Sequence, residues 1–378
     1  MRDHRAWIEG PLNRQSDSSS SKLHSQHNSA RLGRTIRENP LRIVLVGFGT
    51  VGQSLARILT KERDWLVKNH GFEPQVTAIV DSRGYCRDDN GLNLPLALKV
   101  KEKYGTIRKC PGSGETRTPT SQVISETEAE AVVETTPSNF ENGEPGLSNI
   151  KQALASGKHV VTSNKGPLAL AMLSLLELAD HKNLQLRFSG TVGGGTPFLS
   201  FASKCLPGEK ILGIHGILNG TTNYILTRME DASLSFQDGL KEAQEKGYAE
   251  KDPTNDIEGF DTAAKIVIIA NWAMKQKISL RDVKRTGVTK ITAESIKKAK
   301  STGSRIKLIG RVEESRATVK PENVSMADPI CVPDTFNALT FTTENAGDVT
   351  LIGHGAGGEQ TASAIMRDLV DVRTEYAI

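Results

Sequence analysis

Three glycines near residue 50 have the spacing of a pyrophosphate-binding turn. They form a GxGxxG pattern between an apolar, β-branched run, Leu41–Val46, and a helical segment. In such a turn the first glycine permits a tight bend, the second lets the backbone approach a phosphate, and the third lets helix and strand pack closely. The free N–H groups of the helix then face the anion. The pattern predicts a dinucleotide site; the alternative is a glycine-rich turn without a ligand. The expected cofactor contacts here are Gly47, Gly49, Thr50, Val51 and Gly52.

Two charged residues after the next expected strand could distinguish between cofactors. Val76–Val80 should end at Asp81, and Arg83 follows two residues later. An acid at this strand end normally binds the ribose 2′-OH of NAD, whereas a nearby arginine can accommodate the 2′-phosphate of NADP. Asp81 therefore favours NAD and Arg83 favours NADP, unless Arg83 is only a solvated loop charge.

Asp261 and Lys265 stand one helical turn apart and share a helix face. On an exposed helix they would form an ordinary surface ion pair. The adjoining run Ile266–Ala270 is apolar, however, and a helix that is apolar nearly all round is buried. Burial lowers the pKa of a lysine, which suits it to carry a proton near neutral pH. Lys265 is thus a candidate proton carrier.

Alternating strands and helices from Leu41 to about Lys165 predict an α/β fold with a Rossmann-type doubly wound parallel sheet. Further strands are expected at Ala131–Glu134 and His159–Thr162. Ligands of such sheets bind outside the carboxyl ends of the strands, so the loop after Glu134 should lie near the nicotinamide. The loop residues expected there are Thr136, Pro137 and Ser138.

The second half of the chain mixes an expected strand, Ile211–Leu218, with long helices at Phe236–Lys246 and Asp261–Met274. Residues 276–310 are rich in lysine and arginine and are expected to form a solvated helical stretch. A second glycine-rich loop, at 353–358, precedes a predicted helix and resembles an anion-binding turn.

Composition excludes several classes of protein. The chain has 378 residues, which suggests two domains, and 37% of them are hydrophobic, too many for a wholly disordered chain. The longest apolar stretch, near Ile266–Met274, is interrupted by Asn271 and is shorter than the roughly 20 residues of a membrane-spanning helix. Four well-separated cysteines without a CxxC pair argue against a disulfide framework and a structural zinc site, and indicate a reducing compartment.

Most of the net charge of +4 comes from residues 1–40. This segment contains a serine run and no hydrophobic period, so we predict a disordered extension. A transit peptide and a start codon assigned too far upstream are the alternatives. The rest of the chain is nearly neutral, which predicts no nucleic-acid-binding face.

Six separated motifs together resemble those of the homoserine dehydrogenases, in the short form without a C-terminal ACT regulatory domain. The resemblance covers nearly everything from Leu41 onward. It implies NAD(P)-dependent interconversion of L-homoserine and L-aspartate 4-semialdehyde, in threonine, methionine and isoleucine biosynthesis, by a cytoplasmic homodimer. The motifs are Gly47–Gly52, Thr162–Pro167, Thr191–Pro197, Asn219–Tyr224, Gly247–Glu250 and Asp261–Lys265.

The resemblance also assigns roles to individual residues. Lys265 would be the general acid/base, and Lys165 would be a second active-site lysine that contacts both cofactor and substrate. Asp261 and Glu250 would bind the substrate ammonium group, with Asp256 as a further candidate. Thr221 would bind the substrate carboxylate, unless it only caps a helix. Further cofactor contacts implied by the motifs are Lys165, Gly247, Glu250 and Gly357.

A sodium site belongs to the same resemblance. It would be formed by the backbone carbonyl groups of Val192, Gly194 and Thr196 and by a glutamate. This sequence has Ser189 at the glutamate position. The alternative is that the glycine-rich loop only turns the chain.

The implied domains are a nucleotide-binding domain, 41–165, completed by 351–378, and an α/β catalytic and dimerisation domain, 166–350. The residues alone are also compatible with two other functions. One is another Rossmann dehydrogenase that acts on an amino acid, and the other is a dinucleotide-binding protein without turnover.

Overall fold

The computed structural model describes residues 40–111, 113–114, 118–314 and 316–376. The predicted disordered extension, 1–40, lies outside these residues except for Pro40. Among the described residues, no helix is long and apolar enough to cross a bilayer.

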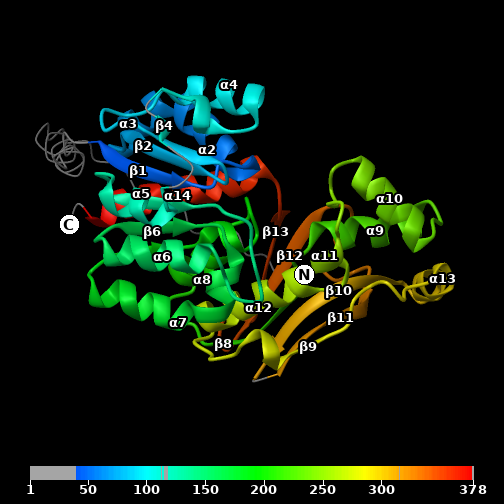
Figure 1. The fold of residues 1–378 in the computed structure, drawn as a ribbon. Coiled ribbons are helices and arrows are strands. Elements are labelled where there is room, and N and C mark those ends of the chain that lie inside the picture. Colours follow the sequence, from blue (N-terminus) through cyan, green and yellow to red (C-terminus); the bar gives the residue numbers. More distant parts are fainter. Residues whose placement is uncertain (1–39, 112, 115–117, 315, 377–378) are drawn as a thin grey trace, which may run out of the picture. The chain divides into compact units, whose positions relative to one another are not determined.

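The first sheet has seven strands in the order β4-β3-β2-β1-β5-β6-β7 (Figure 1). From β2 to β7 all neighbours are parallel, while β3 and β4 add an antiparallel edge. The strands are β1 (Leu41–Val46), β2 (Pro74–Asp81), β3 (Gly84–Arg87), β4 (Ser113–Gly114), β5 (Ala131–Glu134), β6 (His159–Thr162) and β7 (Leu186–Arg187).

Helices cover both faces of this sheet, which confirms the doubly wound architecture. Successive residues of β1 alternate between two cores: Ile43 and Leu45 belong to one, and Val44 and Val46 to the other. A strand buried on both faces explains why the run Leu41–Val46 is almost wholly apolar. The first core includes residues of α2 (Thr50–Lys61), α3 (Arg63–His70), α4 (Leu94–Tyr104) and α14 (Gly358–Tyr376), and the second includes residues of α5 (Thr120–Glu126), α6 (Gly146–Ala155) and α7 (Lys165–His181).

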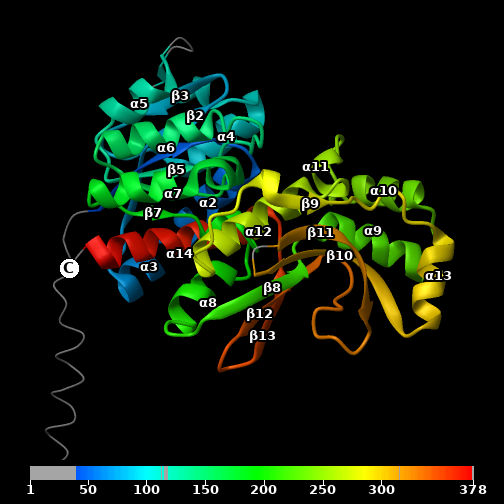
Figure 2. The ribbon, with the colours of Figure 1, turned by 90° about the horizontal axis from the view of Figure 1, so that it is seen from below.

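The second sheet has six strands in the order β13-β12-β8-β10-β11-β9 (Figure 2). Its pairs are antiparallel except for β9 with β11. The strands are β8 (Ile211–Ile217), β9 (Val283–Arg285), β10 (Ser304–Glu313), β11 (Arg316–Ser325), β12 (Phe336–Thr343) and β13 (Asp348–His354). The helices of this region are α8 (Phe198–Cys205), α9 (Gly220–Asp231), α10 (Phe236–Glu245), α11 (Thr254–Ile257), α12 (Phe260–Ala273) and α13 (Ala293–Ser301).

Helix α12 is the buried helix that the sequence predicts. Every residue from Asp261 to Asn271 is buried. The helix packs against α7 next to the first sheet and against β10 and β11 of the second. It therefore connects the two halves of the structure. Three short 3₁₀ helices complete the elements: η1 (Ile107–Lys109), η2 (Ser189–Thr191) and η3 (Leu280–Asp282).

The expected helical stretch at 276–310 is wrong. Only α13 is an α-helix there, and the segment also contains β9 and most of β10. Lys307 on β10 is fully buried and donates hydrogen bonds to Asn223 Oδ1 (2.7 Å) and Thr227 Oγ1 (3.3 Å). The prediction assumed that the lysines and arginines of this segment are solvated. Composition does not distinguish a solvated lysine from one that is paired inside the protein.

After β13 the chain returns to the first sheet. Helix α14 packs along α2, and a Cβ atom added to Gly358 would lie 2.7 Å from Thr50 Cγ2. The last helix of the chain therefore lies beside the glycine-rich turn at its beginning.

Candidate active site

The glycine-rich turn joins β1 to α2 with almost no room for side chains. Gly47 has φ +95°, and a Cβ atom there would lie 2.7 Å from the carbonyl group of Thr135. At Gly52 it would lie 2.2 Å from the Gly47 oxygen. At Gly49 it would meet nothing within 4 Å, so the backbone there faces open space. A pyrophosphate can approach at Gly49, while Gly47 and Gly52 are needed for packing.

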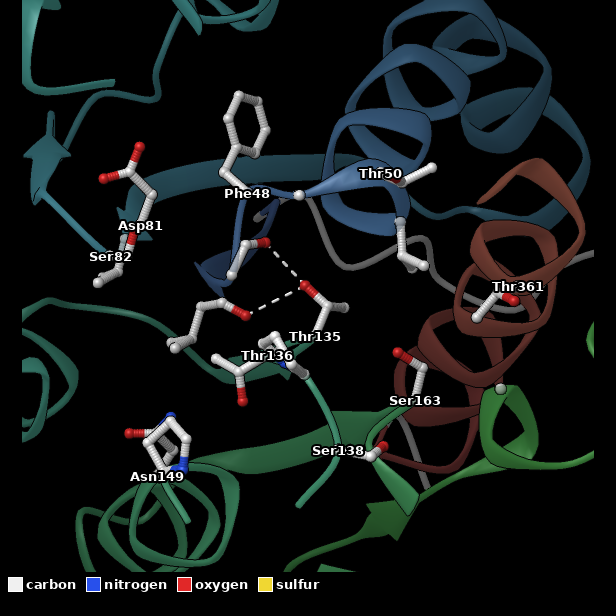
Figure 3. Close-up of a pocket in the computed structure, with 18 of the residues that line it drawn as sticks. Phe48, Thr50, Asp81, Ser82, Thr135, Thr136, Ser138, Asn149, Ser163 and Thr361 are labelled. Atoms are coloured by element: carbon white, nitrogen blue, oxygen red, sulfur yellow. Dashed lines mark hydrogen bonds between the residues drawn. The ribbon is translucent and has the colours of Figure 1, made fainter. Parts of the chain in front are cut away.

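A cavity of about 650 Å³ opens at this turn (Figure 3). Figure 3 shows Asp81 and Ser82 on one side of the cavity and Ser163 and Thr361 on the other. It also shows the Thr135 hydroxyl, which donates to the carbonyl oxygens of Gly47 (2.7 Å) and Val46 (3.1 Å). The predicted cofactor residues among the lining are Gly47, Gly49, Thr50, Val51, Asp81, Thr136, Pro137, Ser138, Lys165 and Glu250.

Asp81 ends β2 and is saturated with hydrogen bonds. Its Oδ1 accepts from Arg83 N (2.8 Å) and Thr106 Oγ1 (3.2 Å), and its Oδ2 from Lys101 Nζ (2.8 Å) and Ile107 N (3.0 Å). Burial raises the pKa of Asp81, but the Lys101 ammonium and the backbone N–H groups outweigh it and hold the pKa below its ordinary value. The Arg83 side chain is exposed, does not line the cavity and runs past Gly105 at the end of α4.

The loop after β5 is held by a buried carboxyl group, Glu134. Its Oε1 accepts hydrogen bonds from the backbone N–H (3.1 Å) and the hydroxyl of Thr136, and its Oε2 accepts from Thr162 Oγ1 (3.2 Å). Among the described residues, Glu134 has no ion-pair partner. Burial raises its pKa, and the hydrogen bonds only partly offset this effect. Further along the loop, Ser138 Oγ accepts from Lys165 N at 3.0 Å.

Lys165 connects the cavity to a second group of charged residues. It begins α7, lines the cavity, and places its ammonium group 3.4 Å from Asp261 Oδ1. Asp261 Oδ2 lies 2.7 Å from Lys265 Nζ, one turn along α12. Lys265 Nζ also donates to the carbonyl oxygen of Leu218 at 2.6 Å. The structure therefore brings Lys165 next to Asp261 and Lys265, which follow it almost 100 residues later in the sequence.

Asp261 has a lowered pKa although its side chain is buried. Burial raises its pKa, but the ammonium groups of Lys265 and Lys165 outweigh this effect and hold the pKa well below its usual range. Asp256, at α11, differs: burial and the charge of Asp261 both raise its pKa. Asn219 Nδ2 donates to both acids, to Asp256 Oδ1 at 2.6 Å and to Asp261 Oδ2 at 3.0 Å.

The loop 247–250 carries Glu250 to the wall of the cavity. It begins at Gly247, which has φ +76° after α10. Thr221 Oγ1 donates to the carbonyl oxygen of Tyr248 at 2.7 Å, and the rings of Tyr248 and Tyr224 lie 4.9 Å apart. The cap of α9 is Asn219, not Thr221. Thr221 thus ties this loop to α9.

The predicted sodium loop follows β7. Gly193 and Gly194 have positive φ, and the carbonyl oxygen of Thr196 accepts the N–H of Phe198 at 2.9 Å. Ser189 Oγ lies 3.2 Å from Ser200 Oγ, and its backbone N–H donates to Asp368 Oδ2 at 2.8 Å. Carbonyl and hydroxyl oxygens suit a hard cation, but position 189 supplies no negative charge. Among the described residues, no group of three or more His, Cys, Asp and Glu side chains could hold a metal ion.

Several residues of the site were not predicted from the sequence. Thr361, which lies on α14 in the first turns after Gly357, and Lys101 of α4 both line the cavity. Gly357 itself has φ +125°. Asn219 and Glu134 hold other site residues in place. Asn219 falls within a recognised motif, but only the fold shows that it meets two acids from α11 and α12.

A doubly wound sheet, a glycine turn open at Gly49 and a cavity of dinucleotide size define an NAD(P)-dependent oxidoreductase of the Rossmann type. Comparison with known proteins gives the family. The family profile for "Homoserine dehydrogenase, NAD binding domain" matches residues 47–189, and the profile for "Homoserine dehydrogenase" matches residues 197–370.

Individual relatives agree with this family. The homoserine dehydrogenase of Methanocaldococcus jannaschii is 46% identical over 87% of this chain and 98% of its own length. The NAD(+)-dependent homoserine dehydrogenase of Pseudomonas canavaninivorans is 36% identical, over 88% of this chain and 96% of its own. A hyperthermophilic archaeal homoserine dehydrogenase in complex with NADPH superimposes with a TM-score of 0.78 at 29% identity, covering 89% of this chain and 98% of that one. The chain belongs to the homoserine dehydrogenase family, as its motifs predict.

Proposed function

We propose that homoserine is oxidised where the cofactor cavity meets the Lys165–Asp261–Lys265 cluster. The observation that carries this proposal is the position of Lys165, which lines the cavity and lies 3.4 Å from Asp261. A bound nicotinamide supplies the two-electron acceptor for the hydride of the substrate's alcohol carbon. The protein must then orient the substrate and remove the hydroxyl proton.

In our proposal Lys265 transfers that proton. Its Nζ is buried and fixed by Asp261 Oδ2 and the carbonyl oxygen of Leu218, which leaves a third ammonium position for the substrate hydroxyl. To act as a base Lys265 must first release one proton to water, and the amine lone pair at this third position then accepts the hydroxyl proton. In aldehyde reduction the ammonium form donates a proton from the same position. Lys165, on the cofactor side of Asp261, aligns the hydroxyl with the nicotinamide.

The substrate ammonium group binds to carboxylates. Asp261 is already paired with two lysines, whereas within the described residues no cationic nitrogen lies within 4.0 Å of Asp256. A half-buried acid without a cation is suited to accept one from a ligand. Asp256 therefore binds the ammonium group together with its neighbour Asp261, and Glu250 approaches from the cavity wall as a third acid. Thr221 as a ligand of the substrate carboxylate remains a prediction, because its hydroxyl proton is committed to Tyr248.

We propose a preference for NADP. All the favourable acceptor positions of Asp81 are occupied, so it has little capacity left for a ribose 2′-OH. Lys101 lies beside it in the cavity wall and could pair with a 2′-phosphate. Steady-state rates with both cofactors test this, and a kcat/KM ratio in favour of NAD would contradict it.

A monovalent cation at the carbonyl groups of Val192, Gly194 and Thr196 would stabilise the loop that carries them. With Ser189 in place of a glutamate, we expect weak binding that matters only at high salt. Melting curves in sodium and in tetramethylammonium chloride of equal ionic strength test this. A sodium-specific rise in Tm would support the site.

We further propose a cytoplasmic homodimer, with 41–165 and 351–378 as the nucleotide-binding domain and 166–350 as the catalytic and dimerisation domain. The support for this proposal is the match of the chain to the homoserine dehydrogenase family over residues 47–189 and 197–370. Light scattering after size exclusion measures the mass. A monomer at micromolar concentration would contradict the dimer.

A further inference from the structure

The side chain of Asn219 is fixed between a helix and two acids. It precedes α9, is 4% exposed, and its Oδ1 accepts hydrogen bonds from Thr222 N (2.9 Å) and Thr222 Oγ1 (3.0 Å). A backbone N–H can only donate, so the amide cannot be turned round without losing this bond. The NH₂ group must therefore point away from the helix.

That NH₂ group has two hydrogens and meets two carboxylates. It donates to Asp256 Oδ1 at 2.6 Å and to Asp261 Oδ2 at 3.0 Å. The acids come from separate elements, α11 and α12, and their negative charges repel each other. Asn219 is the neutral donor that the two share.

We infer that Asn219 is a positioning residue that holds Asp256 and Asp261 together as the binding site for the substrate ammonium group. Without it, the repulsion between the carboxylates would be relieved by movement of the short helix α11. Asp256 would then leave the position in which it meets the substrate. The amide does not line the cofactor cavity, and it donates to Asp261 Oδ2, the oxygen that also pairs with Lys265 Nζ. Its effect is therefore expected on the pair of acids and on homoserine binding, and not on cofactor binding.

This inference rests on the proposed ammonium site and extends it. The competing explanation is that Asn219 is only the cap of α9. The two explanations separate because capping uses Oδ1 and the inferred role uses Nδ2. Asn219→Asp and Asn219→Ser each keep an oxygen that can cap the helix, and each removes the NH₂ group.

The experiment measures KM and kcat for L-homoserine, KM for NADP, Tm, and the pH profile of kcat/KM. We expect KM for homoserine to rise at least tenfold in Asn219→Ser and further in Asn219→Asp, where a third carboxylate adds repulsion. The KM for NADP should change less than twofold. The acidic limb of the profile should move to higher pH in Asn219→Asp, because the added charge favours protonation of Asp256.

The control is the same pair of substitutions at Asn93, which caps α4 through Leu96 N at 3.0 Å. These variants should alter Tm without changing KM for homoserine. Wild-type KM in both Asn219 variants, with any change confined to Tm, would overturn the inference. Absence of homoserine turnover in the wild type would instead contradict the proposed function. If Asn219→Ser does not fold, the near-isosteric Asn219→Asp alone decides.

Discussion

Glu134 and Asp261 are both buried carboxyl groups beside the site, yet their surroundings act in opposite directions. Within the part of the chain that the structure describes, Glu134 meets hydroxyl and amide donors but no cation, and burial raises its pKa. Asp261 meets the ammonium groups of Lys165 and Lys265, and its pKa is lowered. Burial alone therefore does not decide the charge of a carboxyl group; the counter-ions do.

The difference extends to the two regions that these residues belong to. Around the cofactor cavity, glycines, hydroxyl groups and backbone atoms shape the site, and Lys101 pairs with Asp81 through one of its three N–H groups. At α12, charged side chains from α7, α11 and α12 converge, and among the described residues Asp256 has no cationic partner. We expect the first region to bind the dinucleotide, and the second to bind the substrate and transfer its proton. The variants below test that division.

Removal of the Lys265 ammonium should have the largest effect. Lys265→Ala takes away the proposed acid/base, so kcat should fall by about 10²–10⁴-fold. Dinucleotide affinity, measured by fluorescence titration, should stay nearly constant because Lys265 does not line the cavity. Lys297→Ala, an exposed lysine on α13, is the control. A Lys265→Ala enzyme with more than a tenth of the wild-type kcat would refute the assignment.

Neutralising Asp256 should impair binding more than turnover. A charge-assisted hydrogen bond is worth about 1.5–3 kcal/mol, so Asp256→Asn should raise KM for homoserine by roughly 10–100-fold. The kcat value should change little, because Lys265 and Asp261 are intact. Asp252→Asn, at an exposed acid of the same loop, should behave as wild type. Equal KM values for the two variants would remove Asp256 from the substrate site.

Two alanine substitutions in the glycine turn should separate folding from cofactor binding. Gly52→Ala places a methyl group 2.2 Å from the Gly47 oxygen and should reduce the free energy of unfolding by about 1–3 kcal/mol. Gly49→Ala meets no protein atom within 4 Å, so it should keep the wild-type Tm and raise KM for the cofactor. Denaturant melts and steady-state kinetics check both. A Gly49→Ala variant with a lower Tm and an unchanged KM for the cofactor, beside a Gly52→Ala variant with wild-type stability and a raised KM, would show that the phosphates bind elsewhere.

The smallest effect concerns pH and Glu134. A raised pKa means that the folded protein holds a proton that the unfolded chain loses above pH 4.5, so this group reduces stability as pH rises from there. Glu134→Gln cannot titrate. The free energy of unfolding of the variant minus that of the wild type should therefore become more positive from pH 4.5 toward neutrality. Urea melts at several pH values measure it, and a constant or falling difference would show that Glu134 is not held protonated.

The elements near the cofactor could be predicted because their signals are local. The apolar run Leu41–Val46 and the glycines after it predicted the first strand and a helix behind the turn, and the structure has β1 at the same residues. Asp261 and Lys265 were also predictable as a pair, since one helical turn separates them. These predictions needed no knowledge of distant contacts.

Other features could not be read from the sequence. The fold brings together the elements that decide which oxygen atoms Asn219 and Lys101 meet. The hydrogen bonds that saturate Asp81 come from residues 20–26 positions further along the chain, as well as from nearby Arg83. The error at 276–310 has the same origin, because a charged composition does not reveal that Lys307 has buried partners. Likewise, the antiparallel edge strands β3 and β4 are too short to give a periodic signal.

The most direct test of this account compares two substrates of the purified protein with NADP. L-homoserine carries the ammonium group that Asp256, Asp261 and Glu250 are proposed to bind, whereas 4-hydroxybutanoate has the same hydroxyl and carboxylate groups without it. We predict NADPH formation from L-homoserine with a kcat/KM at least about 100-fold higher than for 4-hydroxybutanoate. Similar values for the two compounds would contradict the ammonium site, and no turnover of L-homoserine would contradict the proposed reaction itself.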